Sequence, residues 1–249
     1  MSIAIGIHAG LYILIVTDTR MCFYPPSRPA YFRDGIEKTL RTSTGLMTGT
    51  GYGPLLDAVK VRLSDEDPGD TTRISALCTD EQTRLLGSPL TPRARDAVAR
   101  GTGWMFTYIG HPIDRGEDEL TMGDLALRLG MAHACEHFEV LRLTTGSCPV
   151  IFSEQVPLDA QDALGAPLRD HHVCTEDDLL ADSVTHNVLL CSQVVAATSE
   201  IDPSVSSSFQ VALDIFDGTS ARRIAVAPPV EQGQPVELRF DEDLDARGR

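Results

Sequence analysis

The residues best suited to chemistry are a few polar groups near the start of the chain. Ser2 carries a hydroxyl at the second position, and Asp18 and Arg20 close an apolar segment. Lys38 is one of only two lysines, the other being Lys60. A serine hydroxyl is a weak nucleophile that needs a base within hydrogen-bonding distance. The same residues also fit a plainer interpretation: a frayed terminus, a turn with a surface ion pair, and a solvated lysine.

Two other patterns suggest a metal or a nucleotide, but neither is complete. His133 and His137 lie four residues apart on an expected helix, a spacing that can place two imidazoles on one metal. The residues between them do not match H-E-x-x-H, and no third ligand is evident. The glycine-rich segment 49–53 lacks the Lys-Ser/Thr of a phosphate-binding loop. We therefore expect no metal and no cofactor.

The elements that must position the polar groups begin with a hairpin. Residues 3–18 form two β-rich runs around Ala9-Gly10. Prolines and glycine in residues 21–37 predict a loop, and residues 38–48 predict a second pair of strands. Pro54 suits the first turn of the helix that follows.

The remainder of the chain predicts helices in the middle and strands at the end. Terminal hairpins of this kind can pair into sheets covered by helices, an α+β layered architecture. The expected elements are helices at 70–86, 92–100, 121–138 and 176–200, the last capped by Thr175, and strands at 103–110, 138–143, 148–156 and within 209–228.

Composition narrows the function classes. The chain has 249 residues and a net charge of −15, which argues against nucleic-acid binding because a phosphate backbone requires a basic face. No stretch approaches the roughly 20 apolar residues that span a membrane, and the start does not resemble a signal peptide, so we expect a cytoplasmic protein. We expect one domain over residues 1–230 and an acidic, disordered tail over 231–249.

The polar groups near the start occur in a characteristic order. Ser2 is followed by the hairpin, by Asp18-Thr19-Arg20, by Lys38, and by the Thr48-Gly49-Thr50-Gly51 turn. This order resembles that of proteasome β-subunits and the related bacterial ATP-dependent protease subunits, members of the N-terminal-nucleophile (Ntn) hydrolase superfamily. The spacing from Ser2 to Asp18 matches the family without a gap, whereas Lys38 requires a slightly longer loop before it.

A second resemblance lies near the end of the chain. The segment VVAATSEIDPSVS at 194–206 is similar to the family's A-x-x-A-T-x-x-D-x-x-S stretch. It would place Asp202 and Ser206 (or Ser204) beside the site as supporting residues. Residues 65–175 carry no such resemblance and are divergent or inserted.

The resemblance implies that Ser2 becomes the nucleophile once Met1 has been removed. The α-amino group of Ser2 would then serve as the base, since such amines have a pKa of about 7.7–8.0 and are partly uncharged near neutrality. If Met1 remains, this nitrogen belongs to an amide and cannot accept the proton.

The other matched residues take supporting roles by the same resemblance. Lys38 would stabilise the alkoxide as an ammonium group, and Asp18 would supply its counter-charge. Arg20 would brace the loop. The backbone N–H of Gly49 would face the developing oxyanion.

The resemblance therefore implies a four-layer αββα fold with an atypical middle region, and a hydrolase that cleaves an amide or peptide bond through an acyl-enzyme. Serine replaces the family's usual threonine, so a small amide or ester is as suitable a substrate as a peptide. A homo-oligomer is implied as well. Two alternatives remain open: acyl transfer or cyclisation in small-molecule biosynthesis, and a catalytically silent assembly subunit.

Overall fold

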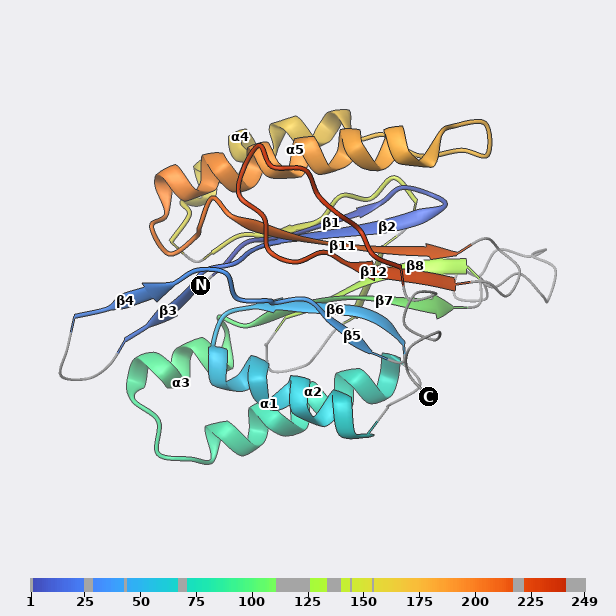
Figure 1. Ribbon diagram of the computed structural model, residues 1–249. Helices are drawn as coiled ribbons and strands as arrows, with labels where there is room; N and C mark the ends of the chain where they lie inside the picture. Colours follow the sequence, from blue (N-terminus) through green and yellow to red (C-terminus); the bar gives the residue numbers. More distant parts are fainter. Residues whose placement is uncertain are drawn as a thin grey trace.

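The chain forms four stacked layers, with helices outside and two β-sheets between them (Figure 1). Each sheet therefore covers the other on one face and carries helices on its opposite face. The computed structural model describes residues 2–24, 29–42, 44–66, 71–110, 126–133, 140–143, 145–153, 155–216 and 222–240.

The first sheet joins the two ends of the chain. Its strands follow the order β10-β1-β2-β11-β12 and pair antiparallel throughout. The expected hairpin is confirmed: β1 and β2 are joined at Gly10, whose φ of 83° favours glycine. The strands are β1 (Ala4–His8), β2 (Tyr12–Asp18), β10 (Val150–Ile151), β11 (Phe209–Phe216) and β12 (Arg222–Val226).

The second sheet has the order β5-β6-β7-β8-β9 and is also antiparallel. The strand pair expected within 38–48 and the strand expected at 103–110 are both confirmed. The strands are β5 (Leu40–Thr42), β6 (Gly45–Thr50), β7 (Gly103–Gly110), β8 (Ala126–His133) and β9 (Val140–Leu143).

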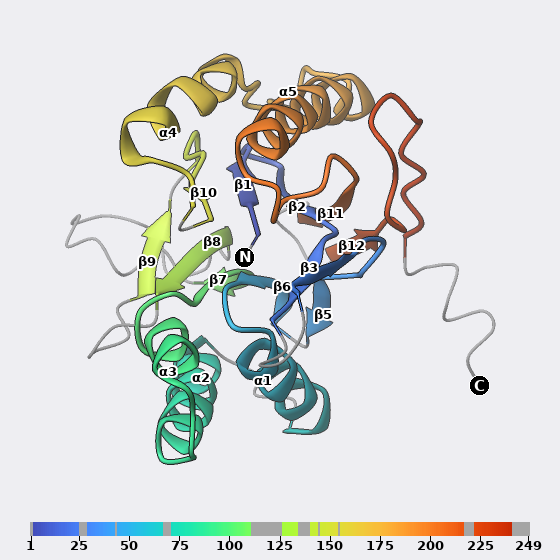
Figure 2. The ribbon, with the colours of Figure 1, turned by 90° about the vertical axis from the view of Figure 1, so that its left-hand side faces the viewer.

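Helices cover the outer face of each sheet (Figure 2). The first sheet is covered by α4 (Leu158–Leu164), a 3₁₀ turn over Ala166–Asp170, and α5 (Leu180–Ile201). The second is covered by α1 (Gly53–Glu66), α2 (Thr71–Leu86) and α3 (Pro92–Ala99). Within the described residues, no helix is both long enough and apolar enough to cross a bilayer.

Strand alternation explains the apolar runs at the start of the chain. Ile5 and Leu14 point toward α5, whereas their neighbours Ala4 and Ile13 point into the space between the sheets. A strand buried on both faces is apolar at nearly every position, as β1 and β2 are.

Four expectations from the sequence require correction. The first concerns residues 21–37, where we expected only a loop. The structure places a small antiparallel sheet there, formed by β3 (Met21–Phe23) and β4 (Tyr31–Arg33). Phe23 and Tyr31 stack with ring centroids 4.8 Å apart, so the prolines lie between two short strands.

The helix expected over 121–138 is also wrong, because residues 126–133 form β8. Leu127, Leu129 and Met131 recur at every second position, which is the period of a strand. His133 therefore lies on a strand, and His137 falls outside the described residues.

The long helix α5 begins at Leu180 and not directly after Thr175. The backbone N–H and hydroxyl of Thr175 both bind the Asp178 carboxylate at 2.7 Å, which forms a separate turn before the helix. The two strands expected at the end of the chain are confirmed as β11 and β12.

We expected a tail without structure from residue 231. Residues 231–240 instead run back along the first sheet, and Ala225 forms a bridge with Phe240. Val236, Leu238 and Phe240 pack against the core beneath α5. Apolar residues at alternate positions explain this packing, and residues 241–249 lie outside the described chain.

Candidate active site

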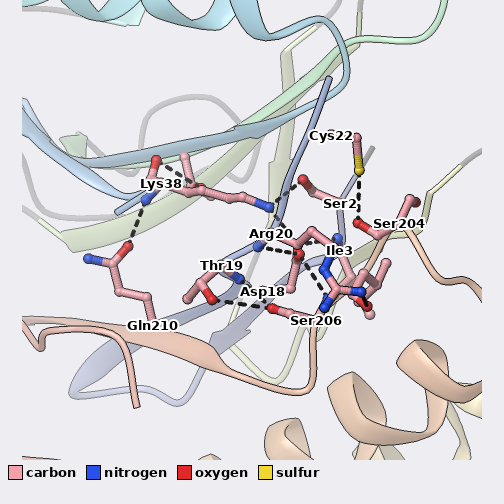
Figure 3. Close-up of polar contacts among 12 residues, drawn as sticks. Ser2, Ile3, Asp18, Thr19, Arg20, Cys22, Lys38, Ser204, Ser206 and Gln210 are labelled. Carbon is pink, nitrogen blue, oxygen red and sulfur yellow. Dashed lines mark hydrogen bonds and ion pairs between the residues drawn. The ribbon is translucent and has the colours of Figure 1, made fainter. Parts of the chain in front are cut away.

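The structure brings Ser2, Lys38 and Asp18 together at one end of the two sheets (Figure 3). The Lys38 ammonium donates to Ser2 Oγ at 2.6 Å and to Asp18 Oδ1 at 2.8 Å. All three residues are buried, with Ser2 6%, Lys38 7% and Asp18 0% exposed. A buried ammonium thus bridges the hydroxyl and a carboxylate.

Asp18 is held by the backbone around it. Its Oδ1 also accepts from the N–H of Ile3 at 3.0 Å, and its Oδ2 accepts from the N–H of Arg20 at 3.0 Å and of Ser206 at 3.3 Å. Asp18 is the last residue of β2, so its carboxylate reaches the N–H groups of the chain as it leaves the sheet. Four donors compensate for the burial of this charge.

Gln210 positions Lys38 and was missed by sequence reasoning. Its Oε1 accepts from the N–H groups of Lys38 at 2.9 Å and Thr39 at 3.0 Å, and its Nε2 donates to Ala227 O at 3.3 Å. Gln210 is fully buried in β11. The signal was an amide side chain within a mostly apolar strand, where a buried amide needs several partners.

Arg20 links two loops at the rim of the site. Its guanidinium forms a bidentate pair with Asp34, with Nε–Oδ1 at 2.6 Å and Nη2–Oδ2 at 2.7 Å. Nη1 donates to Pro203 O at 2.8 Å and to Val205 O at 3.4 Å. These bonds to Asp34 raise the pKa of Arg20, and the guanidinium lowers the pKa of Asp34. Arg20 thus joins Asp34 to the backbone that follows α5, and the bracing role that the resemblance implied stays a prediction.

Of the two supporting residues predicted near the end of the chain, Ser206 lies beside Asp18, whereas Asp202 lies at the end of α5. The Ser206 hydroxyl contacts Thr19 and donates to Ser208 O at 2.8 Å, so Ser206 adjoins Asp18 through both its backbone and its neighbours. Asp202 is the C-cap residue of α5, and its Oδ1 accepts from Ser204 N at 2.8 Å. Among the bonds described, none joins Asp202 to the three buried residues above.

The segment predicted as a glycine turn is the end of β6, with Gly49 inside the strand and Gly51 directly after it. We keep the name glycine turn for residues 48–51, which form one wall of the site. A Cβ on Gly49 would lie 2.6 Å from Leu56 Cδ2 and 3.0 Å from Gly103 O. Gly51 has a φ of 117°, and a Cβ there would lie 2.2 Å from Gly101 O. Both positions therefore require glycine for steric reasons, whatever their chemical role.

A pocket of about 50 Å³ opens beside Ser2. Its walls come from the segment after β2, the glycine turn and the first turns of α1. The lining residues are Ser2, Arg20, Met21, Cys22, Ile36, Lys38, Gly49, Gly51, Gly53, Leu56, Asp57 and Lys60. Sequence reasoning did not identify Cys22, Asp57 or Lys60 as part of the site.

The described residues contain no group of three or more His, Cys, Asp or Glu side chains able to hold a metal ion. The site itself also does not suit a metal cation. Its one carboxylate, Asp18, is already paired with the Lys38 ammonium, which in turn donates to the Ser2 hydroxyl.

Four layers in the order αββα, formed by two antiparallel sheets with helices on their outer faces, define the class of fold. The chain has the proteasome-like fold of the Ntn-hydrolase superfamily. The fold class predicted from the sequence is confirmed.

Solved structures of Anbu proteins share this fold. Anbu from Pseudomonas aeruginosa, solved as a helical assembly, is 12% identical with a TM-score of 0.57 and covers 93% of this chain and 88% of its own. Anbu from Yersinia bercovieri, described as an ancestral beta-subunit, is 12% identical with a TM-score of 0.56, covering 94% and 89%. A mutant of Anbu from Hyphomicrobium sp. strain MC1 is 14% identical with a TM-score of 0.54, covering 93% and 89%. No family model and no curated protein matches the sequence.

Proposed function

We propose that this chain is an N-terminal serine hydrolase that cleaves an amide or peptide bond through an acyl-enzyme. The observation that carries the proposal is the contact of Lys38 Nζ with Ser2 Oγ at 2.6 Å and with Asp18 Oδ1 at 2.8 Å. A buried lysine that only neutralised a carboxylate would have no need of the hydroxyl of the second residue.

The proposed reaction begins with removal of Met1, which frees the α-amino group of Ser2. Ser2 Oγ accepts a hydrogen bond from Lys38, so the hydrogen of the Ser2 hydroxyl is available for donation to a base. The uncharged amine of Ser2 accepts this proton, directly or through one water, as Oγ attacks the substrate carbonyl carbon. Lys38 lowers the cost of the negative charge on Oγ, and Asp18 supplies the counter-charge of the ammonium.

Attack forms a tetrahedral intermediate whose oxyanion would lie beside the glycine turn. We propose that the N–H of Gly49 donates to it, a contact typically worth about 3–4 kcal/mol. Collapse breaks the C–N bond, and the Ser2 ammonium returns its proton to the leaving amine. Water then cleaves the ester by the same steps, which regenerates Ser2.

The proposal also includes the oligomeric state and the cellular location of the protein. Anbu from Pseudomonas aeruginosa forms a helical assembly, and we propose that this chain also forms a homo-oligomer, in the cytoplasm. The substrate is an acyl compound with an amide or ester bond, either a peptide or a small molecule.

The intact mass of protein made without an N-terminal tag tests the first requirement. A mass lacking Met1 is expected. If Met1 is retained, the protein is made as a fusion that a protease cleaves directly before Ser2. Cleavage then makes Ser2 the first residue and frees its α-amino group. The protein is then treated with an acylating β-lactone, and the labelled residue is identified by peptide mapping.

We expect one adduct, on Ser2, and none in Ser2→Ala. Lys38→Met is expected to fold and to label at least about tenfold more slowly, because a lost charge-assisted hydrogen bond is worth roughly 1.5–3 kcal/mol. A protein with a free Ser2 amine that forms no adduct would contradict the proposal.

A further inference from the structure

A larger cavity lies between the first sheet and its helices, apart from the pocket beside Ser2. Its volume is about 400 Å³, against about 50 Å³ for that pocket, and the two spaces share no lining residue. The floor comes from the edge strand β10 and the residues beside it, and the walls come from α4 and the 3₁₀ turn over Ala166–Asp170 (Figure 2). The cavity is therefore separate from the site of the proposed reaction.

The floor of this cavity is apolar because alternate residues of one segment face the same way. Cys148, Val150 and Phe152 are spaced by two positions in and beside β10, so they share one face of the sheet. Val150 pairs with Ile5, whose side chain faces the helical layer. Leu168 adds apolar surface from the 3₁₀ turn. An apolar floor and a volume within roughly 300–1,000 Å³ are typical of small-molecule sites.

His171, which borders the cavity, has one ring nitrogen without a partner. Its Nδ1 lies 2.8 Å from Leu168 O, and because a carbonyl oxygen only accepts, Nδ1 carries the hydrogen. In the neutral ring this leaves Nε2 as an acceptor. Nε2 is buried and has no hydrogen-bond partner among the described residues. We expect a hydroxyl or N–H group of a ligand in the cavity to supply the missing donor.

Arg169 gives the cavity a positive group. It forms no ion pair with any residue that the structure describes. A guanidinium binds a carboxylate or a phosphate through two parallel hydrogen bonds. Asp162 borders the same cavity and the chain has a net charge of −15, so the single charge of a carboxylate is favoured over the double charge of a phosphate.

We propose that this cavity binds a small monocarboxylate with an apolar, ring-sized body and a hydroxyl or N–H group close to the carboxylate. The body would lie on Val150 and Phe152. The carboxylate would accept from Arg169, and the hydroxyl or N–H group would donate to His171 Nε2. Binding here does not depend on catalysis at Ser2, because no residue lines both spaces.

The test uses 3-phenyllactate and two matched compounds on the full chain. 3-Phenylpropane-1,2-diol lacks the carboxylate, and 3-phenylpropionate lacks the hydroxyl. None of the three contains an amide or ester bond, so a hydrolase cannot consume them. Binding is followed by the shifts of backbone amide signals in ¹H–¹⁵N NMR spectra during titration.

We expect 3-phenyllactate to shift the signals of residues 150–152 and 165–171 with a dissociation constant on the order of 1 mM, as for a ligand of about 12 non-hydrogen atoms. The diol should bind roughly threefold more weakly, since water screens an ion pair at an exposed arginine. 3-Phenylpropionate should bind roughly fivefold more weakly, because it leaves His171 Nε2 without a donor.

Two variants and a control assign the contacts. Arg169→Met should make 3-phenyllactate and the diol bind equally. His171→Asn keeps a donor for Leu168 O and removes the Nε2 acceptor, so it should make 3-phenyllactate and 3-phenylpropionate bind equally. Arg84→Met removes a positive charge from α2, in the opposite helical layer, and should leave all three dissociation constants unchanged.

The site is refuted if 3-phenyllactate shifts no signal at roughly tenfold above the expected dissociation constant. Shifts that map only to the pocket beside Ser2, or equal affinities for the three compounds, refute it as well. If binding occurs in the cavity but neither Arg169→Met nor His171→Asn changes the preferences, the proposed contacts are wrong. Loss of the preferences in these two variants, with Arg84→Met unchanged, supports the proposal.

Discussion

The buried pair of Asp18 and Lys38 gives the sharpest prediction for stability. Asp18 has four hydrogen-bond donors around it, three of them backbone N–H groups and one the Lys38 ammonium. Lys38 Nζ has only two described acceptors, Asp18 Oδ1 and Ser2 Oγ. Removing either partner breaks the same ion pair. The charge that remains, however, keeps three hydrogen-bond partners if it is Asp18 and one if it is Lys38.

Asp18→Asn should be the more damaging change. The amide places its NH₂ group against donors whichever way it is turned, and the ammonium keeps only a neutral hydroxyl. Breaking a buried pair in this way typically costs about 3–5 kcal/mol. Lys38→Met leaves Asp18 with three N–H donors, so we expect a loss of one charge-assisted bond, about 2–3 kcal/mol. Either loss is large against a typical total of about 5–15 kcal/mol.

Urea denaturation of the parent, of both single variants and of the double variant measures these losses. The double variant should cost less than the sum of the singles, because neither charge is then left alone. Full additivity, a larger loss for Lys38→Met than for Asp18→Asn, or three variants within about 0.5 kcal/mol of the parent would refute this account of the pair.

Three further outcomes are expected. Gly49→Ala would bring its Cβ within 2.6 Å of Leu56 Cδ2, so urea denaturation should show a loss of about 1–3 kcal/mol, and acylation should slow. Lys60→Met should not lower the thermal midpoint at neutral pH, because burial lowers the Lys60 pKa and penalises its charged form. That penalty is complete below the lowered pKa and vanishes as pH rises to the ordinary value of 10.5, so any gain should shrink in alkali. Burial raises the pKa of Cys78 to about 12, so iodoacetamide should modify it at neutral pH only after unfolding, as peptide mapping would show.

The sequence predicted the parts of the fold whose pattern is local. Alternating or continuous apolar runs identified β1, β2, β7 and β11, and the position of Pro54 identified the start of α1. The ordered motif from Ser2 to Gly49 identified residues that the structure brings together. Their chemical roles remain predictions, because proximity alone does not establish a reaction.

What the sequence could not provide depends on contacts between distant segments. Gln210 meets the N–H of Lys38 across 172 positions, and Ser206 meets Asp18 across 188. The local periodicity of a sequence does not predict such contacts between distant segments. The error at β8 had a different cause, since its alternate apolar residues were assigned a helical period although their spacing was two.

The position of the divergent segment 65–175 in the fold determines whether the resemblance to proteasome β-subunits can be applied to the site. Among the described residues, those that line the pocket beside Ser2 all fall between Ser2 and Lys60. The segment 65–175 instead supplies α2, α3 and β7–β10, which pack in the layers around the site. In the part of this segment that the structure describes, the divergence therefore falls in the scaffold and not among the residues that line the pocket, and we expect α1 and the glycine turn to determine substrate preference.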